Sequence, residues 1–402
     1  MYNFDEIIDR KNVPSSKWYP NYLNSLFGST NVLPFWIADM DFKAPDCILD
    51  AIKQKADYGI LAYEYSSPSF YNSLINWVKE HHHYELQREH IAPSPSIGAS
   101  MGVLINAFTD EGDGIITQPP VFMEYKTFIK SNKRNLVKNK LVENEGVYAI
   151  DFDDLETKCR NSKNKILIVC NPHNPIGQIW NDEEMIKMAE ICQRNSVLLV
   201  SDEVHADIVY GNNRFNGYLS IPDRFHDTVV SVYSPVKTFN LGGFSDSFIF
   251  IKDPALKDKI TAHFKKYSLG KTNGTVRAGL EGGFTSGNDW VKALIQYLDN
   301  NIDIIESAIK DNKLPIRLNR PAASYQLWLD FRPTGMKPKE IHQFLTQKAK
   351  LALNAGLWFG REGAGFTRMN IASPASVIKE GMERLVKAFD QLSPDSYRDN
   401  NE

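Results

Sequence analysis

The chain has 402 residues, 42% of them hydrophobic, and its 46 basic and 49 acidic side chains give a net charge of −3. This length and composition predict a globular protein with one large core or two domains, and the small net charge argues against nucleic-acid binding. The N-terminus lacks the apolar segment of a secretory signal, and no apolar run approaches the roughly 18 residues of a membrane helix. We therefore expect a cytoplasmic protein with no membrane or nucleic-acid partner and with reduced, non-metal cysteines at 47, 159, 170 and 192.

Short runs rich in Ile and Val alternate with amphipathic stretches in the middle of the chain. Such runs are typical of strands buried on both faces of a sheet. Between two of them, Asn181 followed by Glu184 is the capping pattern of a helix, which we expect over 181–192. Repeated strand–helix–strand units predict right-handed crossovers and a largely parallel sheet. The expected strands are 114–117, 166–170, 197–201, 228–232 and 248–251.

The last third of the chain has a different pattern, in which two strands and two helices predict a smaller α+β domain. The strands are expected at 325–331 and 367–371, and the helices at 338–349 and 377–392. The predicted fold is thus α/β, with a mostly parallel sheet in a large domain. We assign residues 48–288 to the large domain, and residues 1–47 with 289–402 to the small domain, which ends in a polar tail at 393–402.

Three adjacent histidines at 81–83 look at first like metal ligands. Adjacent residues of a helix point in different directions, so these side chains cannot converge on one ion. We therefore expect a solvated helix end at this position, and no metal site.

Polar motifs follow the predicted strands, at the edge where open α/β sheets bind ligands. Lys237 follows the strand at 228–232 in the string Ser234-Pro-Val-Lys. A lysine that forms an imine needs a pocket in which partial desolvation frees the amine, whereas an isolated lysine is usually solvated. Asp202, at the end of another strand, either caps a turn or faces the ring nitrogen of a cofactor. His205 is then either a core histidine or a neighbour of the same ring.

Two further motifs suit a phosphorylated cofactor. The string Asn171-Pro-His-Asn-Pro is a rigid turn that holds Asn174 as a hydrogen-bond donor. The string Ser94-Pro-Ser-Ile-Gly-Ala-Ser opens a predicted helix, where backbone N–H groups of Gly98 and Ala99 can cradle a phosphate. The second motif is weak alone, because many helices begin with small residues and bind nothing.

In this order the motifs resemble the fold-type I pyridoxal-5′-phosphate (PLP) enzymes of the aminotransferase class I/II superfamily. The narrower resemblance is to the cystathionine β-lyase group of C–S lyases, which includes a modulator of the maltose regulon. It covers residues 3–392 and is carried by Trp36-Ile-Ala-Asp-Met-Asp-Phe, Asn171-Pro-His-Asn-Pro, Ser201-Asp-Glu-Val-His, Lys237-Thr-Phe-Asn-Leu, Tyr325–Leu329 with Asp330, and Gly365-Phe-Thr-Arg-Met-Asn. The resemblance implies the aspartate-aminotransferase-like fold, PLP as cofactor and a homodimer with shared active sites.

The resemblance also implies a role for each residue. Lys237 is expected to hold PLP as a Schiff base and to act as acid and base at the substrate Cα, and Asp202 is expected to pair with the pyridinium nitrogen. The implied PLP contacts are Gly98, Ala99 and Ser234 at the phosphate, Phe122 on the ring, Asn174 and His205 beside O3′, and Tyr63 at the phosphate of the partner subunit. The implied contacts to an amino-acid substrate are Arg368, Ala38 and Asn174. Relatives usually carry tyrosine at the position of Phe122.

The implied reaction is β-elimination from L-cystathionine or a similar cysteine S-conjugate, which yields a thiol (homocysteine), pyruvate and ammonia. The same residues also suit an aminotransferase, and nothing in the sequence enforces elimination over transamination. A third hypothesis is a regulatory protein that uses the fold as an interaction surface. A complete set of catalytic residues would be superfluous in such a protein.

Overall fold

Seven strands form the central sheet of the computed structural model, which describes residues 2–269 and 273–392. Their order is β2-β10-β9-β8-β7-β3-β4, and β10 alone runs against the others. The predicted mostly parallel sheet is therefore confirmed, and all five expected strands belong to it. The strands are β2 (Ile91–Ser94), β3 (Gly114–Thr117), β4 (Asn135–Lys138), β7 (Asn164–Cys170), β8 (Leu198–Asp202), β9 (Val229–Tyr233) and β10 (Ser247–Phe250).

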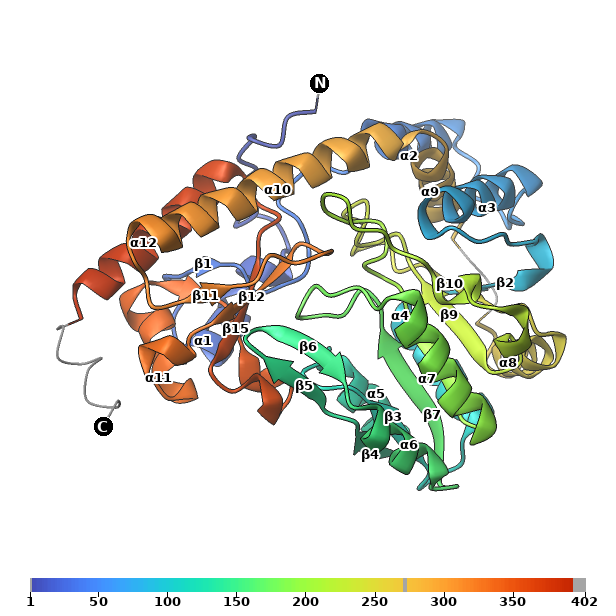
Figure 1. The fold of residues 1–402 in the computed structure, drawn as a ribbon. Coiled ribbons are helices and arrows are strands. Elements are labelled where there is room, and N and C mark those ends of the chain that lie inside the picture. The colour runs from blue at the N-terminus through green and yellow to red at the C-terminus, as the bar shows by residue number, and fades with distance from the viewer. Residues whose placement is uncertain (1, 270–272, 393–402) are drawn as a thin grey trace.

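Helices cover both faces of this sheet (Figure 1). Successive strand residues point to opposite faces, so Ile166 and Ile168 contact one layer of helices while Leu167 and Val169 contact the other. Burial on both sides explains why the strands read as continuous apolar runs. The first layer is α4 (Ile97–Phe108), α5 (Glu124–Ser131) and α8 (Pro254–Lys266), and the second is α3 (Pro68–His82), α6 (Phe152–Arg160) and α7 (Asp182–Arg194).

The predicted capping box of α7 is confirmed. The Glu184 N–H donates to Asn181 Oδ1 at 2.9 Å, and the Asn181 N–H donates to Glu184 Oε2 at the same distance. These bonds satisfy two backbone donors that the first turn leaves without helical partners. The cap fixes the start of α7 at Asp182, a few residues after the turn that carries Asn174.

The smaller sheet is antiparallel, in the order β11-β12-β15-β14. Its two longer strands confirm the predicted strands of the last third, and α12 confirms the final helix. The helix expected at 338–349 is in fact α11 followed by a π-helical turn at Phe344–Lys348. The elements are β11 (Arg317–Leu318), β12 (Gln326–Asp330), β14 (Asn354–Ala355), β15 (Phe366–Asn370), α10 (Asn288–Asp311), α11 (Pro338–Gln343) and α12 (Ala375–Asp390).

The N-terminal segment lies against the smaller sheet region. The short strand β1 (Leu33–Pro34) pairs in parallel with β13 (Leu351–Ala352). Arg10 binds Asp39 and Asp41 through its guanidinium, and the buried Lys17 binds Asp41 at 2.6 Å. The ion pairs hold the N-terminal segment together, and the β1–β13 pairing supports our proposal that 1–47 and 289–402 form one domain. The predicted polar tail at 393–402 lies outside the described residues.

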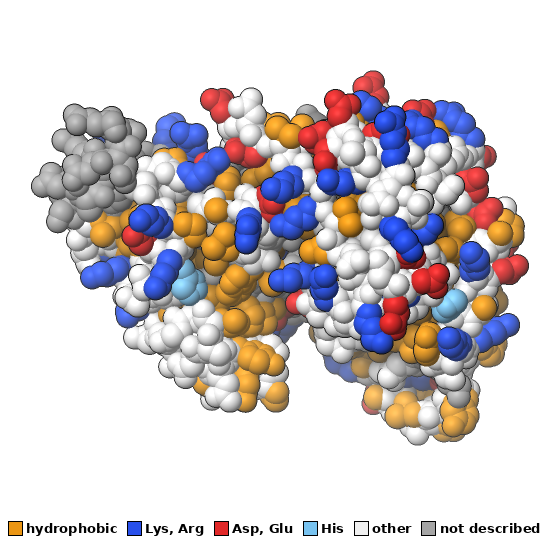
Figure 2. Space-filling view, turned by 90° about the horizontal axis from the view of Figure 1, so that it is seen from below, with side chains coloured by type: hydrophobic (Ala, Val, Ile, Leu, Met, Phe, Trp, Pro, Cys, Tyr) orange, Lys and Arg blue, Asp and Glu red, His pale blue; other side chains and the backbone are white. Residues whose placement is uncertain are grey.

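Other elements were not anticipated from the sequence. The hairpin β5–β6 extends from the large sheet toward the smaller one, and the long helix α10 spans the top of the molecule in Figure 1. In the described part of the chain, no helix is both long enough and apolar enough to cross a membrane. The face in Figure 2 is hollowed between its left and right parts. The remaining elements are α1 (Pro20–Phe27), α2 (Asp46–Tyr58), α9 (Gly274–Ser286), β5 (Leu141–Asn144) and β6 (Val147–Ile150).

Candidate active site

Three neighbouring parallel strands bring the predicted site residues to one edge of the sheet. The register pairs Cys170 of β7 with Asp202 of β8, and Asp202 in turn with Val232 of β9. The loops that follow β7 and β9 carry Asn174 and Lys237. Asp202 is 28 positions from Asn174 and 35 from Lys237 in the sequence. The three residues nevertheless converge, because the carboxyl ends of parallel strands meet at the same edge of the sheet.

Lys237 lies where this edge meets the N-terminal segment. Its Nζ donates a hydrogen bond to the Ala38 carbonyl oxygen at 2.5 Å. Loss of hydration lowers the pKa of Lys237 to about 8, although the nearby carboxylates of Asp39 and Asp202 oppose this effect. An amine with this pKa is partly unprotonated near neutral pH, as a nucleophile or general base must be.

Asp202 is a buried carboxylate whose oxygens are held on two sides. Its Oδ2 accepts a hydrogen bond from the Tyr125 hydroxyl at 2.7 Å, and its Oδ1 accepts one from the Val204 N–H at 3.3 Å. Burial raises the pKa of Asp202 to about 6, against the opposing effects of Tyr125, Val204 and Lys237. No basic side chain among the described residues forms an ion pair with it, so it can take a cationic partner.

His205 and Asn174 lie in the same buried cluster. The His205 Nδ1 lies 3.1 Å from the Ser324 hydroxyl, and its ring meets Tyr325 edge to face. Burial, together with the positive charges of Lys237 and Arg368, lowers the pKa of His205 to about 3, so the ring is neutral at physiological pH. His205 can therefore exchange hydrogen bonds in the site without adding charge.

Arg368, on β15 of the smaller sheet, completes the cluster from the opposite side. Its guanidinium donates to the Asn354 side-chain oxygen at 2.9 and 3.2 Å, to Asn174 Oδ1 at 3.2 Å and to the Trp36 carbonyl at 2.9 Å. All these acceptors are neutral, and in the described ranges no carboxylate pairs with Arg368. Burial lowers the pKa of Arg368 to about 10, so it remains a buried cation suited to an anionic ligand.

Two of the groups expected to donate to a phosphate already donate hydrogen bonds within the protein. Gly98 and Ala99 do open helix α4, but the Ala99 N–H already donates to the Ser96 hydroxyl at 3.1 Å. The buried Ser234 hydroxyl donates to the Asp246 carbonyl at 2.5 Å. The phosphate roles of Gly98, Ala99 and Ser234 therefore stay predictions, with Ser234 needing to turn before it can donate to a ligand.

Phe122 and Tyr63 occupy different surroundings. The half-buried Phe122 ring packs edge to face on Tyr125, with 5.5 Å between ring centres, and Tyr125 in turn binds Asp202. Tyr63 is 97% exposed in the single chain, and it lines a separate hollow of about 1040 Å³ that includes Tyr71 and Arg88. The structure thus brings Phe122, but not Tyr63, to the cluster around Lys237 of the same chain.

A second buried carboxylate supports the loop that carries Lys237. Asp207 Oδ1 accepts from Trp77 Nε1 at 3.1 Å and from His82 Nε2 at 2.8 Å, and its Oδ2 accepts from Tyr233 at 2.7 Å and from Thr238. The prediction of a solvated helix end is therefore wrong for His82. The C-terminal turn of α3 packs inward, which sequence spacing alone does not reveal.

We expect Asp207→Asn to lower the free energy of unfolding by about 3 kcal/mol, because it leaves donors facing a neutral amide inside the core. Burial alone would raise the pKa of Asp207, yet the hydrogen bond and charge of His82 hold it well below the usual value. The stabilisation is therefore present above the unfolded pKa of about 3.9 and is lost as pH falls further. The free energy of unfolding is measured by urea unfolding of wild type and Asp207→Asn at pH 7 and below pH 4. The exposed Asp258→Asn is the control. If wild type and Asp207→Asn differ by less than about 1 kcal/mol at pH 7, the prediction is wrong.

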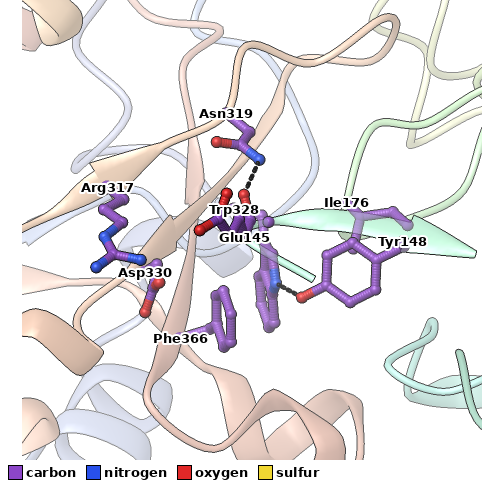
Figure 3. Close-up of a pocket in the computed structure, with 9 residues that line it drawn as sticks. Glu145, Tyr148, Ile176, Arg317, Asn319, Trp328, Asp330 and Phe366 are labelled. Atoms are coloured by element: carbon purple, nitrogen blue, oxygen red, sulfur yellow. Dashed lines mark hydrogen bonds between the residues drawn. The ribbon is translucent and has the colours of Figure 1, made fainter. Parts of the chain in front are cut away.

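A small cavity lies away from this cluster, where the β5–β6 hairpin meets the smaller sheet (Figure 3). The Trp328 indole N–H donates to the Tyr148 hydroxyl at 2.9 Å, and the Asn319 amide donates to the Glu145 carbonyl at 3.1 Å. The cavity measures about 20 Å³, which is room for about one water molecule. It is a packing contact between the two sheet regions and cannot accept an amino acid.

Comparison with known proteins identifies the family. The model of the aminotransferase class I and II family matches residues 30–389. The chain belongs to this family. Cystathionine β-lyase PatB of Bacillus subtilis is 34% identical over 96% of this chain and 100% of that protein. Among solved structures, cystalysin from Treponema denticola, which contains PLP, has a TM-score of 0.93 at 30% identity over 98% of this chain and 100% of cystalysin. The PLP-bound C–S lyase from Staphylococcus hominis has a TM-score of 0.89 at 28% identity, over 96% and 98% of the two chains.

The site of this class I and II aminotransferase-family protein also includes side chains to which the sequence analysis assigned no role. Tyr125 binds Asp202, Asn354 binds Arg368, and Tyr325 donates to the Ala38 carbonyl at 3.2 Å. Tyr125 lies three residues after Phe122, so the only local signal for it was a second aromatic residue close to Phe122 in the sequence. Nothing local marks Asn354, because its role depends on sheet pairing with Arg368.

Proposed function

We propose that this protein is a PLP-dependent C–S β-lyase that acts on L-cystathionine or a related cysteine S-conjugate. With cystathionine and water as reactants, the products are homocysteine, pyruvate and ammonia. The names of PatB as a cystathionine β-lyase and of the Staphylococcus hominis protein as a PLP-bound C–S lyase support this reaction. The observation that carries the proposal is the meeting of a low-pKa lysine, a buried carboxylate and a buried arginine that has only neutral partners.

The residues present fit PLP. A cofactor with an aldehyde needs a reactive amine, which Lys237 supplies, and its basic ring nitrogen needs an anionic partner, which Asp202 supplies. Asp202 ends β8, and Lys237 lies on the loop that follows the adjacent strand β9, so one flat ligand can reach both. The ring of Phe122, packed against the Tyr125 ring that binds Asp202, would provide an apolar face for it.

Each residue then has a defined task in the reaction. PLP, when bound, supplies an electron sink that stabilises negative charge at the substrate Cα. Lys237 would hold the cofactor and later exchange the Cα proton, because its pKa of about 8 suits proton transfer near neutral pH. Arg368 would bind the α-carboxylate through two N–H groups and so fix which Cα bond faces Lys237. Asp202 would keep the ring nitrogen protonated.

The test is to load the purified protein with PLP, add L-cystathionine without any keto acid, and follow pyruvate and free thiol together. Equal release of both over many turnovers supports the lyase. A single turnover that converts the cofactor to its pyridoxamine form, without pyruvate, would instead indicate an aminotransferase, the activity that the family description names. A protein that does neither would contradict the proposal.

We also propose a homodimer in a reducing, cytoplasmic setting. The loop between α2 and α3 exposes Ile60, Leu61, Tyr63 and Tyr65, each more than half exposed in the single chain, and such an apolar patch is typical of a subunit interface. All four cysteines are free thiols, as expected in a reducing compartment. Sedimentation of the PLP-loaded protein should give twice the chain mass of 45.7 kDa. A fully active monomer would contradict the proposal that sites are shared.

A further inference from the structure

The carboxylate assigned to the PLP ring nitrogen has a neighbour whose role the motifs do not define. We propose that Tyr125 is a positioning residue that keeps the Asp202 carboxylate ionised, and so available to PLP, as the pH falls. The inference rests on the proposed function, because Asp202 must be the partner of the ring nitrogen. It concerns a residue that acts through Asp202 and does not itself touch the reacting atoms.

The hydrogen bond is short and protected from water. The Tyr125 hydroxyl donates to Asp202 Oδ2 at 2.7 Å, and both side chains are at least 98% buried. Tyr125 is fixed by its place in the first turn of α5, where it packs in the same core cluster as Ile129. A donor held in this way faces no competing water, so its bond to an anion is strong.

The direction of the electrostatic effect follows from the environment. Burial raises the pKa of Asp202 to about 6, and the Tyr125 hydrogen bond is the foremost influence that opposes burial; the Val204 N–H and the charge of Lys237 act in the same direction as Tyr125. The buried thiol of Cys170, which pairs with Asp202 across the sheet, is another titratable neighbour. Burial and the adjacent Asp202 charge also raise the pKa of the Tyr125 phenol well above its usual value, so the phenol stays protonated and remains a donor. Without this donor, the Asp202 carboxyl would take up its proton at higher pH. A neutral carboxylic acid cannot form an ion pair with a pyridinium.

The location of this phenol is distinctive. Phe122 supplies a ring without a hydroxyl, and Tyr125 follows it by three residues with its ring in edge-to-face contact with that of Phe122. Phe122 thus provides an apolar face, and Tyr125 provides the hydroxyl donor. The donor is directed to the carboxylate that would hold the ring nitrogen.

The experiment is a titration of the PLP-free protein with PLP from pH 5.5 to pH 8.5, for wild type and Tyr125→Phe. We expect the ratio of the two dissociation constants to be near one at pH 8.5, where Asp202 is ionised in both proteins. As pH falls through 6 the ratio should rise toward about tenfold, because a loss of one hydrogen bond to a carboxylate shifts its pKa by about one unit. The protonation of PLP itself is common to both proteins and cancels in the ratio.

Two controls separate the possible outcomes. Tyr218→Phe removes another buried phenol, whose hydroxyl contacts the Met188 sulfur at 3.6 Å, and should leave the ratio near one at every pH. In an Asp202→Ala background, Tyr125→Phe should cause no pH-dependent change, as a double-mutant cycle requires. A ratio for Tyr125→Phe that does not vary with pH, whether one or much larger, would overturn the inference and leave Tyr125 a packing residue.

Failure of the proposed function would look different. If Asp202→Ala leaves PLP affinity unchanged, then Asp202 is not the ring-nitrogen partner, and the site assignment itself is wrong. If Asp202→Ala weakens binding while Tyr125→Phe gives a flat ratio, only the inference about Tyr125 fails. Thermal unfolding of each PLP-free variant checks that the fold survives the substitution.

Discussion

Lys237→Ala is expected to lower pyruvate release from L-cystathionine by about 10³-fold or more. The substitution removes the only amine among the described site residues, so nothing remains to hold the cofactor covalently or to exchange the Cα proton. Positioned acid–base groups alone contribute about 10²–10⁴-fold, and loss of the nucleophile adds to that. The measurement is pyruvate and thiol release under saturating PLP, with the PLP dissociation constant as a second readout.

The exposed Lys259→Ala on helix α8 is the matched control and should retain wild-type turnover. Turnover that persists in Lys237→Ala within tenfold of wild type would exclude Lys237 as the catalytic lysine. The same variant addresses the regulatory hypothesis. A regulatory effect that survives intact while turnover is lost would show that two functions share this fold.

Arg368→Lys should reduce kcat/KM for L-cystathionine by about 10²-fold. Lysine keeps the charge but loses the planar fork that can bind a carboxylate through two N–H groups, so the effect measures geometry and not charge alone. A hydrogen bond to a charged group contributes about 1.5–3 kcal/mol, so the loss of one of the two bonds to the carboxylate accounts for the expected change. Because Arg368 also bonds Asn354, Asn174 and the Trp36 carbonyl, circular dichroism must confirm that the fold is retained.

A substrate analogue gives the sharper comparison for Arg368. Wild type should process an analogue without the α-carboxylate poorly, and Arg368→Lys should process it no worse than wild type does. Arg384→Lys serves as control, since Arg384 pairs with Glu380 on the exposed side of α12. An equal loss for cystathionine and the analogue would mean that Arg368 supports the fold and does not bind the carboxylate.

Much of the fold could be predicted from local patterns. The strands β3, β7, β8 and β9 are buried on both faces, so they appear in the sequence as short, mostly apolar runs of Ile, Leu and Val. The capping residues of α7 are equally local, because a cap depends on neighbours within one turn. The antiparallel direction of β10 was not predictable, since strand direction is set by how the chain returns to the sheet.

The sequence by itself determined the family resemblance, the α/β fold class and the candidates Lys237, Asp202, Asn174, His205 and Arg368, because each lies in a short motif whose spacing is visible along the chain. Only the tertiary structure decided what surrounds them. Tyr125 meets Asp202, and His82 meets Asp207, across 77 and 125 residues. Such contacts depend on helices docking against the sheet, and burial then sets the pKa of each group. The motifs identify the reactive side chains, whereas the packing around them determines whether each is charged at a given pH.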